Sequence, residues 1–392
     1  MSSILTEGSM VGVKKKILVI TDHMPWGHRS IARAIYGFLK TKEKEGKFSV
    51  EYTEVRAEVG IANDIYTFSY RYFPLSNRLA RWIPINKRAR TLIESLSVFN
   101  MPELKRLVDR VEPDVIISCY WFHSHSLVKL REKENKKFIL WSIVADPWTI
   151  NPATFVPQAD LNLVYDEVGV KLAKKYGIEA DRVMETGWWV RGEMYQPIDR
   201  VQARKKLGIF DNRPVIFVGG GSLGTNSLTR LLPVLMMIKK KCAFIFNTGT
   251  DKLLHSMVDE YIKLLRRMKR GEDLIVRNLG WIDNIAEVLT ASDIVFGKAG
   301  PNFLFDVVAR KKPMVAITHI GGQEDGNIEI IKKKGLGWVK EKPGQAADFL
   351  LEYLEDPKYY QRKFRNNIRE EARNNQKTMG KVWERVKKEL SR

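Results

Sequence analysis

The stretch KKKILVITDHMPWGHRSIARAIYGFLKTKEK, residues 14–44, decides the fold class, because it joins an apolar strand to an amphipathic helix through a short loop. Residues 14–22 have the apolar run of a parallel strand that is covered on both faces. The helical pattern starts after the loop 23–28, so this loop lies at the carboxyl end of the strand. Strand, loop and helix in this order are the repeating unit of a doubly wound α/β sheet.

Similar units extend along the rest of the chain, with an interruption near residues 186–197. Further strand-like runs lie at residues 48–55, 113–122, 137–146, 159–166, 213–224, 242–249, 274–281, 292–301 and 312–322. A helix is expected over residues 227–241. We therefore predict an α/β fold with two Rossmann-like domains facing each other across a cleft that strand-end loops line. The expected domains are residues 1–190 and 198–355, followed by a basic helical tail, residues 356–392.

Composition agrees with two globular domains. The chain has 392 residues, which exceeds one ordinary domain, and its 44% hydrophobic content excludes wholesale disorder. Only two cysteines occur, Cys119 and Cys242, which excludes a disulfide framework and a cysteine-rich zinc module. Because we find neither a 20-residue apolar run nor a signal peptide, we expect a cytoplasmic protein without a membrane-spanning helix.

The charge is strongly positive, with 66 Lys and Arg against 46 Asp and Glu, a net +20. Nucleic acid, an anionic membrane and phosphorylated small molecules are all suitable partners for such a chain. Residues 65–93 combine basic and aromatic side chains without any acid. This mixture suits the headgroup region of an anionic bilayer. The same mixture could bind RNA, or form a basic helix packed on the protein body.

Several strand-end loops of the second half are suited to anions and hydroxyl groups. Gly220, Gly221 and Ser222 lie between a strand and a helix, where glycine allows close approach to a phosphate. The spacing fits neither a dinucleotide fingerprint nor a P-loop, and a tight turn is the alternative. Gly300, Pro301 and Asn302 open a second helix at a strand end, with Asp306 one turn later. Residues 321–327, GGQEDGN, place polar side chains after another strand.

The order GGGS, GW-D-N, SDIV-GKAGP, KP and GQEDGN resembles the donor half of glycolipid-forming glycosyltransferases with the GT-B fold. It is most similar to the monogalactosyldiacylglycerol synthases and bacterial diacylglycerol glycosyltransferases, and more distantly to the transferase that makes lipid II. The resemblance covers residues 14–356 approximately. It implies a UDP-sugar donor held without a cofactor or a bound metal, and a lipid acceptor, foremost diacylglycerol.

The resemblance also assigns residues to the donor. It implies that residues 220–222 and 300–302 hold the diphosphate, and that Trp281 and Ile282 meet the uracil. Asp306 takes the place of the family's usual glutamate for the ribose. Lys298 supplies positive charge near the leaving UDP. Three residues would contact the sugar or its phosphates: Gln323, Glu324 and Asn327.

The loop before the first helix resembles the family's acceptor-side GGGHR-S-A motif, with Gly27, His28 and Arg29 in matching places. Histidine suits the removal of a hydroxyl proton at neutral pH, so His28 is our candidate base. Its alternative role is to cap the helix. Asp146 matches a family aspartate that assists the base, or else forms an Asp-Pro turn. His123 and His125 have an HxH spacing without an evident third ligand, so we do not expect zinc.

We therefore predict a UDP-sugar-dependent hexosyltransferase of the inverting kind that is attached peripherally to the inner face of the cell membrane. The alternatives are transfer to a polyprenyl-linked or other lipid, and a non-catalytic nucleotide-sugar-binding protein. Nucleic acid ranks last as a partner because the chain lacks an RNA-binding motif. The sequence does not decide which sugar is transferred, nor the oligomeric state.

Overall fold

The computed structural model describes residues 14–23, 27–45, 48–56, 101–219, 229, 231–268, 273–342 and 344–391. All structural statements below concern these residues. Gly220, Gly221, Ser222 and the stretch 65–93 lie outside them.

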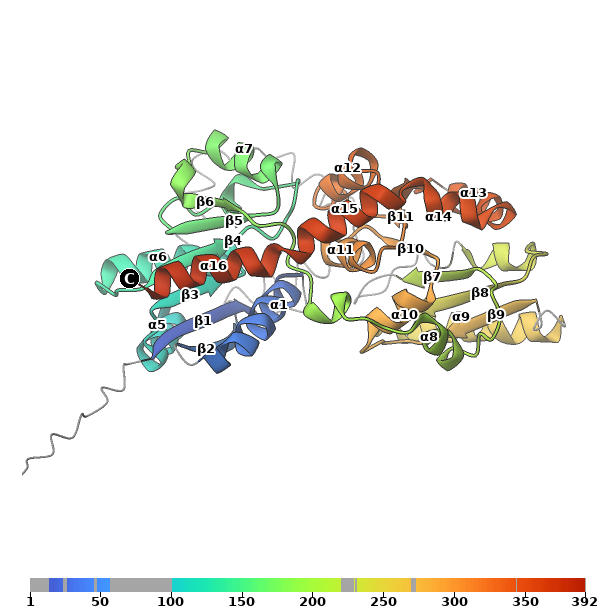
Figure 1. Ribbon diagram of the computed structural model, residues 1–392, viewed down its shortest axis with the longest axis horizontal. Helices are drawn as coiled ribbons and strands as arrows, with labels where there is room; N and C mark the ends of the chain where they lie inside the picture. The colour runs from blue at the N-terminus through green and yellow to red at the C-terminus, as the bar shows by residue number, and fades with distance from the viewer. Residues whose placement is uncertain are drawn as a thin grey trace, which may run out of the picture.

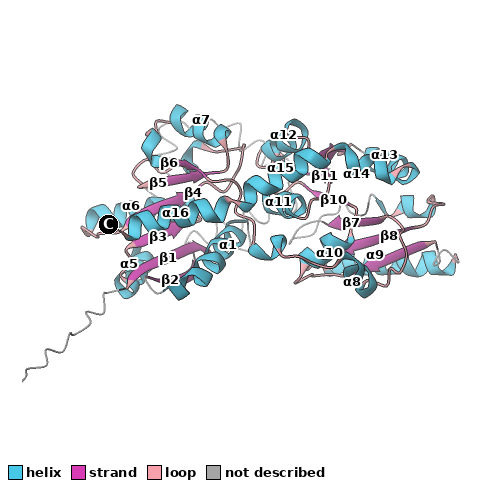
Figure 2. Cartoon of the chain, in the orientation of Figure 1, coloured by secondary structure: helices cyan, strands magenta, loops and turns pink. Residues whose placement is uncertain are grey.

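Two parallel sheets of six strands each form the framework, in the orders β2-β1-β3-β4-β5-β6 and β12-β11-β10-β7-β8-β9. The first contains β1 (Lys15–Asp22), β2 (Phe48–Val55), β3 (Val115–Ser118), β4 (Ile139–Ile143), β5 (Leu161–Val164) and β6 (Val183–Glu185). The second contains β7 (Val215–Gly219), β8 (Cys242–Asn247), β9 (Leu274–Asn278), β10 (Ile294–Lys298), β11 (Met314–Thr318) and β12 (Gly337–Val339). The sheets lie end to end along the molecule, with helices packed around them (Figures 1 and 2). The predicted doubly wound α/β class is confirmed.

The helices connect and cover these strands. They are α1 (Gly27–Lys42), α5 (Met101–Val111), α6 (Trp121–Lys133), α7 (Glu167–Lys175), α8 (Arg200–Lys206), α9 (Lys252–Arg267), α10 (Ile285–Ala291), α11 (Pro301–Ala309), α12 (Asp325–Lys333), α13 (Gln345–Glu355), α14 (Pro357–Lys363), α15 (Arg365–Gln376) and α16 (Thr378–Leu390). In the described ranges, none is long and apolar enough to cross a bilayer.

Two differences from the sequence prediction concern short elements. The expected helix over residues 227–241 is wrong, because its described part contains no α-helical residue and includes the 3-10 helix η7 (Pro233–Met236) before β8. Pro233 has no N–H and its ring would clash with a preceding carbonyl inside an α-helix, which explains the shorter element. The edge strands β6 and β12 were not expected, since three residues each carry too little periodic signal.

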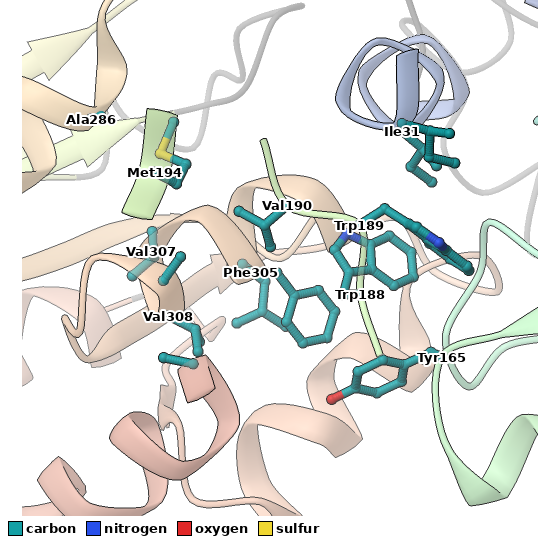
Figure 3. Close-up of a cluster of buried hydrophobic side chains, with 14 of the residues drawn as sticks. Ile31, Tyr165, Trp188, Trp189, Val190, Met194, Ala286, Phe305, Val307 and Val308 are labelled. Carbon is teal, nitrogen blue, oxygen red and sulfur yellow. The ribbon is translucent and has the colours of Figure 1, made fainter. Parts of the chain in front are cut away.

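The linker between the sheets is buried by aromatic packing (Figure 3). Trp188 stacks on Phe305 of α11 with ring centroids 5.0 Å apart, and Tyr165 lies 4.9 Å from the same ring. Trp188 and Trp189 are each only 1% exposed. These contacts join the end of the first domain to a helix of the second, so the linker is part of a common core.

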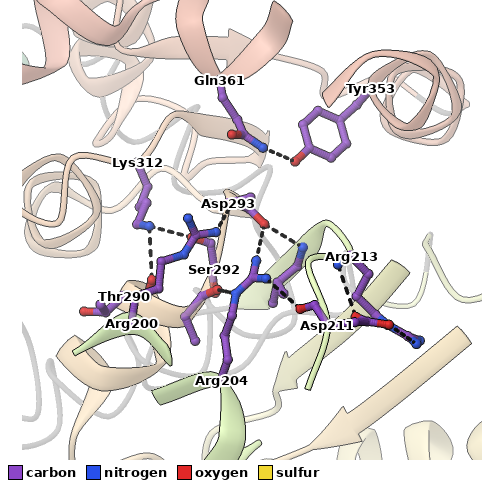
Figure 4. A network of polar contacts seen from close by, with 12 residues as sticks. Arg200, Arg204, Asp211, Arg213, Thr290, Ser292, Asp293, Lys312, Tyr353 and Gln361 are labelled. Carbon is purple, nitrogen blue, oxygen red and sulfur yellow. Dashed lines mark hydrogen bonds and ion pairs between the residues drawn. The ribbon is translucent and has the colours of Figure 1, made fainter. Parts of the chain in front are cut away.

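A buried polar network fixes the other end of the linker (Figure 4). Arg204 of α8 donates to Asp293 Oδ2 at 2.7 Å, and the backbone N–H of Val215 donates to the same oxygen at 2.9 Å. The Lys312 ammonium donates to the Ser292 carbonyl at 2.6 Å. Its burial lowers the pKa of Lys312 to about 8. The network ties α8 to the start of β7 and thereby to the second sheet.

Candidate active site

The strand-end loops of the two sheets meet, which is the arrangement that the fold prediction required. Asn302 Nδ2, at the start of α11 after β10, donates to the Gly27 carbonyl after β1 at 2.9 Å. The Gly326 N–H, at the start of α12 after β11, donates to Thr149 Oγ1 after β4 at 2.6 Å. Because all strands are parallel, these contacts join the carboxyl ends of both sheets.

His28 lies in the first turn of α1, next to the Gly27 contact with α11. Its Nδ1 is 2.9 Å from the carbonyl oxygen of Cys119, just after β3. Because a carbonyl only accepts, Nδ1 carries the proton and neutral His28 has its lone pair on Nε2. Desolvation by burial lowers the pKa of His28 to about 4 against the opposing effect of this carbonyl. The ring is therefore neutral at pH 7, with a lone pair that no described residue engages.

An ion cluster holds the first turn of α1. Arg29 donates to both carboxylate oxygens of Glu54 on β2, and Tyr52 donates to Glu54 Oε1 at 2.6 Å. These bonds, Arg29 foremost, lower the pKa of Glu54 to about 2. Arg33 adds a second cation, its Nη2 3.2 Å from Glu54 Oε1. The cluster fixes the residue next to His28, and sequence reasoning missed it because Glu54 has no motif around it.

Asp146 lies in the loop after β4, half-buried, three residues before the Thr149 contact with α12. The structure thus places it on the same edge as His28, since β3 alone separates β1 from β4. His123 and His125 of α6 point to different backbone carbonyls, of Val55 at 3.1 Å and of Ala153 at 3.0 Å. In the part of the chain described, no group of three or more His, Cys, Asp or Glu side chains is arranged so that it could hold a metal ion.

On the second sheet, side chains of the turn before α12 and of its first residues contact the end of β10 and the residue after it. Lys298 at the end of β10 pairs with Glu324, which is 4% exposed. Asn327 Nδ2 donates to the Ala299 carbonyl at 2.8 Å. Gly300 passes close to the Lys298–Glu324 pair, since a Cβ at this position would lie 3.1 Å from the Lys298 ammonium. Gln323 lies in the same turn, half-buried.

The side chain of Asn302 makes two contacts within the protein that the sequence did not predict. Its side-chain amide is used on both sides: Nδ2 donates to Gly27, and Oδ1 accepts from the Trp188 indole N–H at 3.1 Å. The amide side chain therefore joins the two sheets and the linker. What α11 presents to a ligand is its backbone N-terminus, where Pro301 lacks an N–H and the next amides have no partner within the helix.

Asp306 lies one turn into α11, 8% exposed, and accepts from Arg191 of the linker at 3.0 Å. Burial raises the pKa of Asp306 to about 6, while Arg191 acts in the opposite direction. Its carboxylate thus faces the linker, and the ribose contact stays a prediction. Trp281 and Ile282 follow β9, and the Trp281 ring is 56% exposed, with its N–H bonded to Asp283 at 2.9 Å.

Two family models match the chain in succession. The monogalactosyldiacylglycerol synthase model matches residues 17–190, and the C-terminal domain model of glycosyltransferase family 28 matches residues 215–379. The first covers β1 through the linker tryptophans, and the second begins at β7.

Individual proteins are similar over most of the chain. Monogalactosyldiacylglycerol synthase 1 of Arabidopsis thaliana is 22% identical over 360 residues, covering 87% of this chain and 65% of the plant protein. This chain thus spans about two thirds of the length of the plant relatives. The processive diacylglycerol β-glucosyltransferase of Staphylococcus carnosus is 22% identical over 362 residues, covering 88% and 86%.

Solved structures share the fold. The crystal structure of MurG from Acinetobacter baumannii superposes with a TM-score of 0.59 at 12% identity, covering 95% of this chain and 99% of that one. At this identity the likeness concerns the fold alone, and it is the GT-B architecture.

Proposed function

Because this chain belongs to the glycosyltransferase family that joins the monogalactosyldiacylglycerol synthases with glycosyltransferase family 28, we propose that it transfers a hexose from a UDP-sugar to a lipid hydroxyl. Diacylglycerol is the proposed acceptor, since the names of a plant relative and of a bacterial relative both contain it. The observation that carries the proposal is His28. It is a neutral histidine whose Nε2 no described residue engages, one residue from the contact with the N-terminus of α11.

In the proposed reaction, His28 Nε2 takes the proton of the acceptor hydroxyl. The acceptor oxygen attacks the sugar C1 on the face opposite to the UDP, the bond from C1 to the diphosphate oxygen breaks, and UDP leaves with the electron pair. The product is the inverted glycoside. The Cys119 carbonyl keeps Nδ1 protonated, so it orients the ring and stabilises the imidazolium that forms.

The second sheet is the proposed donor site. The N-terminus of α11 and the Lys298 ammonium supply positive charge to the leaving diphosphate, together with the backbone of residues 220–222. We propose that Trp281 and Ile282 contact the uracil and that Gln323 contacts the sugar. Glu324 and Asn327 have their side chains bonded to Lys298 and Ala299, so their proposed part is to shape the site.

A lipid acceptor requires contact with a membrane. We propose that residues 65–93 make this contact with an anionic bilayer and attach the protein peripherally to the inner face of the cell membrane. This stretch and residues 220–222 lie outside the described residues, so the proposal rests on their composition.

A panel of UDP-sugars assayed on diacylglycerol vesicles, with lipid products identified by mass spectrometry, tests the function. We expect a hexosyl-diacylglycerol from one UDP-hexose. His28→Ala should lower kcat by about 10²–10⁴-fold while donor affinity by calorimetry stays unchanged. Donor binding without any product would instead favour a nucleotide-sugar-binding protein. Turnover by His28→Ala at the wild-type rate would remove His28 as the base.

The pH profile gives a second check on His28. The base must be neutral, and its lowered pKa of about 4 keeps it neutral above that value. We therefore expect no loss of kcat between pH 8 and pH 6 from this group, and a loss only as pH falls toward 4. An ordinary histidine would lose activity near pH 6.5.

A further inference from the structure

His319, which follows β11, has both ring nitrogens bonded to carboxylates. Nδ1 is 2.6 Å from Glu341 Oε1, beyond β12, and Nε2 is 2.9 Å from Asp325 Oδ1, the first residue of α12. A carboxylate only accepts, so both nitrogens must donate. Only the imidazolium has an N–H on each nitrogen, and this geometry therefore requires a cation at His319.

The hydrogen bond to Asp325 connects His319 to the turn between β11 and α12. Asp325 Oδ1 also accepts from the Gly322 N–H at 2.9 Å, and Gly322 has a φ of +81° that suits glycine. On the other side of the turn, the Ile320 N–H donates to Glu324 Oε2 at 2.8 Å. Residues 320–324, the donor turn, are thus held at one end by Lys298 and at the other by His319.

The protonated histidine offsets part of the negative charge around this turn. Three carboxylates, of Glu324, Asp325 and Glu341, face two cations, Lys298 and His319. Lys340 adjoins Glu341 in sequence, but its ammonium lies over the Phe349 ring, 5.1 Å from the centroid. A neutral His319 would lose one N–H and turn a lone pair toward one carboxylate, and the donor turn would become more negative by one charge.

We propose that His319 is a positioning residue for the donor: its imidazolium, held between Glu341 and Asp325, fixes residues 320–324 in the conformation that binds the sugar diphosphate. This inference rests on the proposed function, which assigns this turn to the donor. His319 does not touch the reacting atoms. It acts through Asp325 on the turn and through its charge on the anionic donor.

Titration of His319 follows a definite direction. The hydrogen bond with Glu341, foremost, raises the pKa of His319 above its ordinary value of 6.5, with Asp325 adding to it and burial opposing it. The cation, and with it the ordered turn, is complete below pH 6.5 and is lost as pH rises through the raised pKa. Donor affinity should therefore fall in the alkaline range.

Calorimetric titration of UDP-glucose and, separately, UDP-galactose into the full chain at pH 6 and pH 9 tests this. For the sugar that binds, we expect wild-type affinity to fall roughly tenfold from pH 6 to pH 9, as for the loss of a charged hydrogen bond. His319→Gln should be weak at both pH values, with KM raised more than kcat is lowered. His319→Lys, which keeps a cation at pH 9, should restore much of the affinity there. Lys263→Gln removes one exposed cation of α9 and should match the wild type.

The outcomes separate the two proposals. Wild-type binding that is equal at pH 6 and pH 9, or His319→Gln binding like the wild type at pH 6, would overturn the role of His319 alone. Binding of neither sugar nucleotide by the wild type would overturn the donor assignment and this inference with it. Should His319→Gln fail to fold by circular dichroism, Glu341→Gln replaces it. That variant should move the loss of affinity to lower pH, and an unmoved profile would count against the proposal.

Discussion

At the scale of single residues, the buried carboxylate of Asp306 has two competing roles. The motif around it suggests a ribose contact, whereas its oxygen accepts from Arg191 of the linker at 3.0 Å. Sequence spacing placed this acid correctly one turn into α11 but could not provide its partner, which lies 115 residues earlier in the chain. The same holds for His28, whose motif is visible in the sequence and whose Cys119 carbonyl is not.

The substitution Asp306→Asn tests the state of this carboxyl group through the pH dependence of the free energy of unfolding. Burial raises the pKa of Asp306 to about 6, so the folded state holds this proton more tightly than the unfolded chain does, and wild-type stability falls as pH rises from about 4 to 6. Asp306→Asn does not titrate. Relative to it, the wild type should lose about 2 kcal/mol over this range in urea unfolding.

The control for this experiment is Asp211→Asn, since Arg213 lowers the pKa of Asp211 to about 2 and its titration lies below the range measured. A difference between wild type and Asp306→Asn that stays constant from pH 4.5 to pH 7 would contradict the raised pKa of the buried Asp306 carboxyl. Loss of UDP affinity in Asp306→Asn, with unchanged pH dependence of unfolding, would support the ribose contact instead.

At the scale of elements, the strands were predictable and the contacts between loops were not. Buried parallel strands such as β1 and β10 contain unbroken apolar runs, residues 17–20 and 294–296, so composition reveals them. The loop 321–327 was predicted as polar, but the structure begins α12 at Asp325 and places Gly326 in its first turn. There, a Cβ would lie 2.5 Å from the Thr149 N and 2.7 Å from Thr149 Oγ1. Glycine is needed for this approach, which no local pattern reveals.

Gly326→Ala should therefore push α12 away from the loop after β4. We expect it to lower kcat/KM by about tenfold or more, because misplacement of the two loops by an ångström costs orientation of the reactants. Gly37→Ala is the matched control, since a Cβ on Gly37 of α1 meets nothing within 4 Å. That variant should keep its activity and gain roughly 0.5–1 kcal/mol in stability. Equal activity of both variants would show that the contact of Gly326 with Thr149 is dispensable.

At the scale of the whole molecule, the chain joins its two sheets twice, through the linker and through its last helices. The Trp188 backbone N–H donates to Asn375 Oδ1 of α15 at 2.8 Å, and the Thr378 hydroxyl of α16 donates to the Thr186 carbonyl at 2.9 Å. Figure 1 shows α16 lying along the first sheet, far in sequence from its strands. The sequence predicted a basic helical tail here. Its apolar spacing indicates a buried face, but spacing does not say which surface a helix covers.

The substitution Trp383→Ala tests how much the first sheet depends on α16 for its stability. Trp383 of α16 is 9% exposed, lies 5.4 Å from the Phe48 ring of β2, and has the Lys42 ammonium 5.8 Å from its own centroid. Removing the indole should lower the free energy of opening around β2 and α1 by roughly 3 kcal/mol, the usual cost of a large buried aromatic. Hydrogen exchange would report this as faster exchange of amides in β1, β2 and α1, with β7 to β11 unchanged.

Tyr359→Ala, which removes a half-exposed ring of α14, should leave both sheets protected. Equal loss of protection in the two sheets would mean that α16 stabilises the molecule as one unit, because the linker core would then transmit the change from the first sheet to the second.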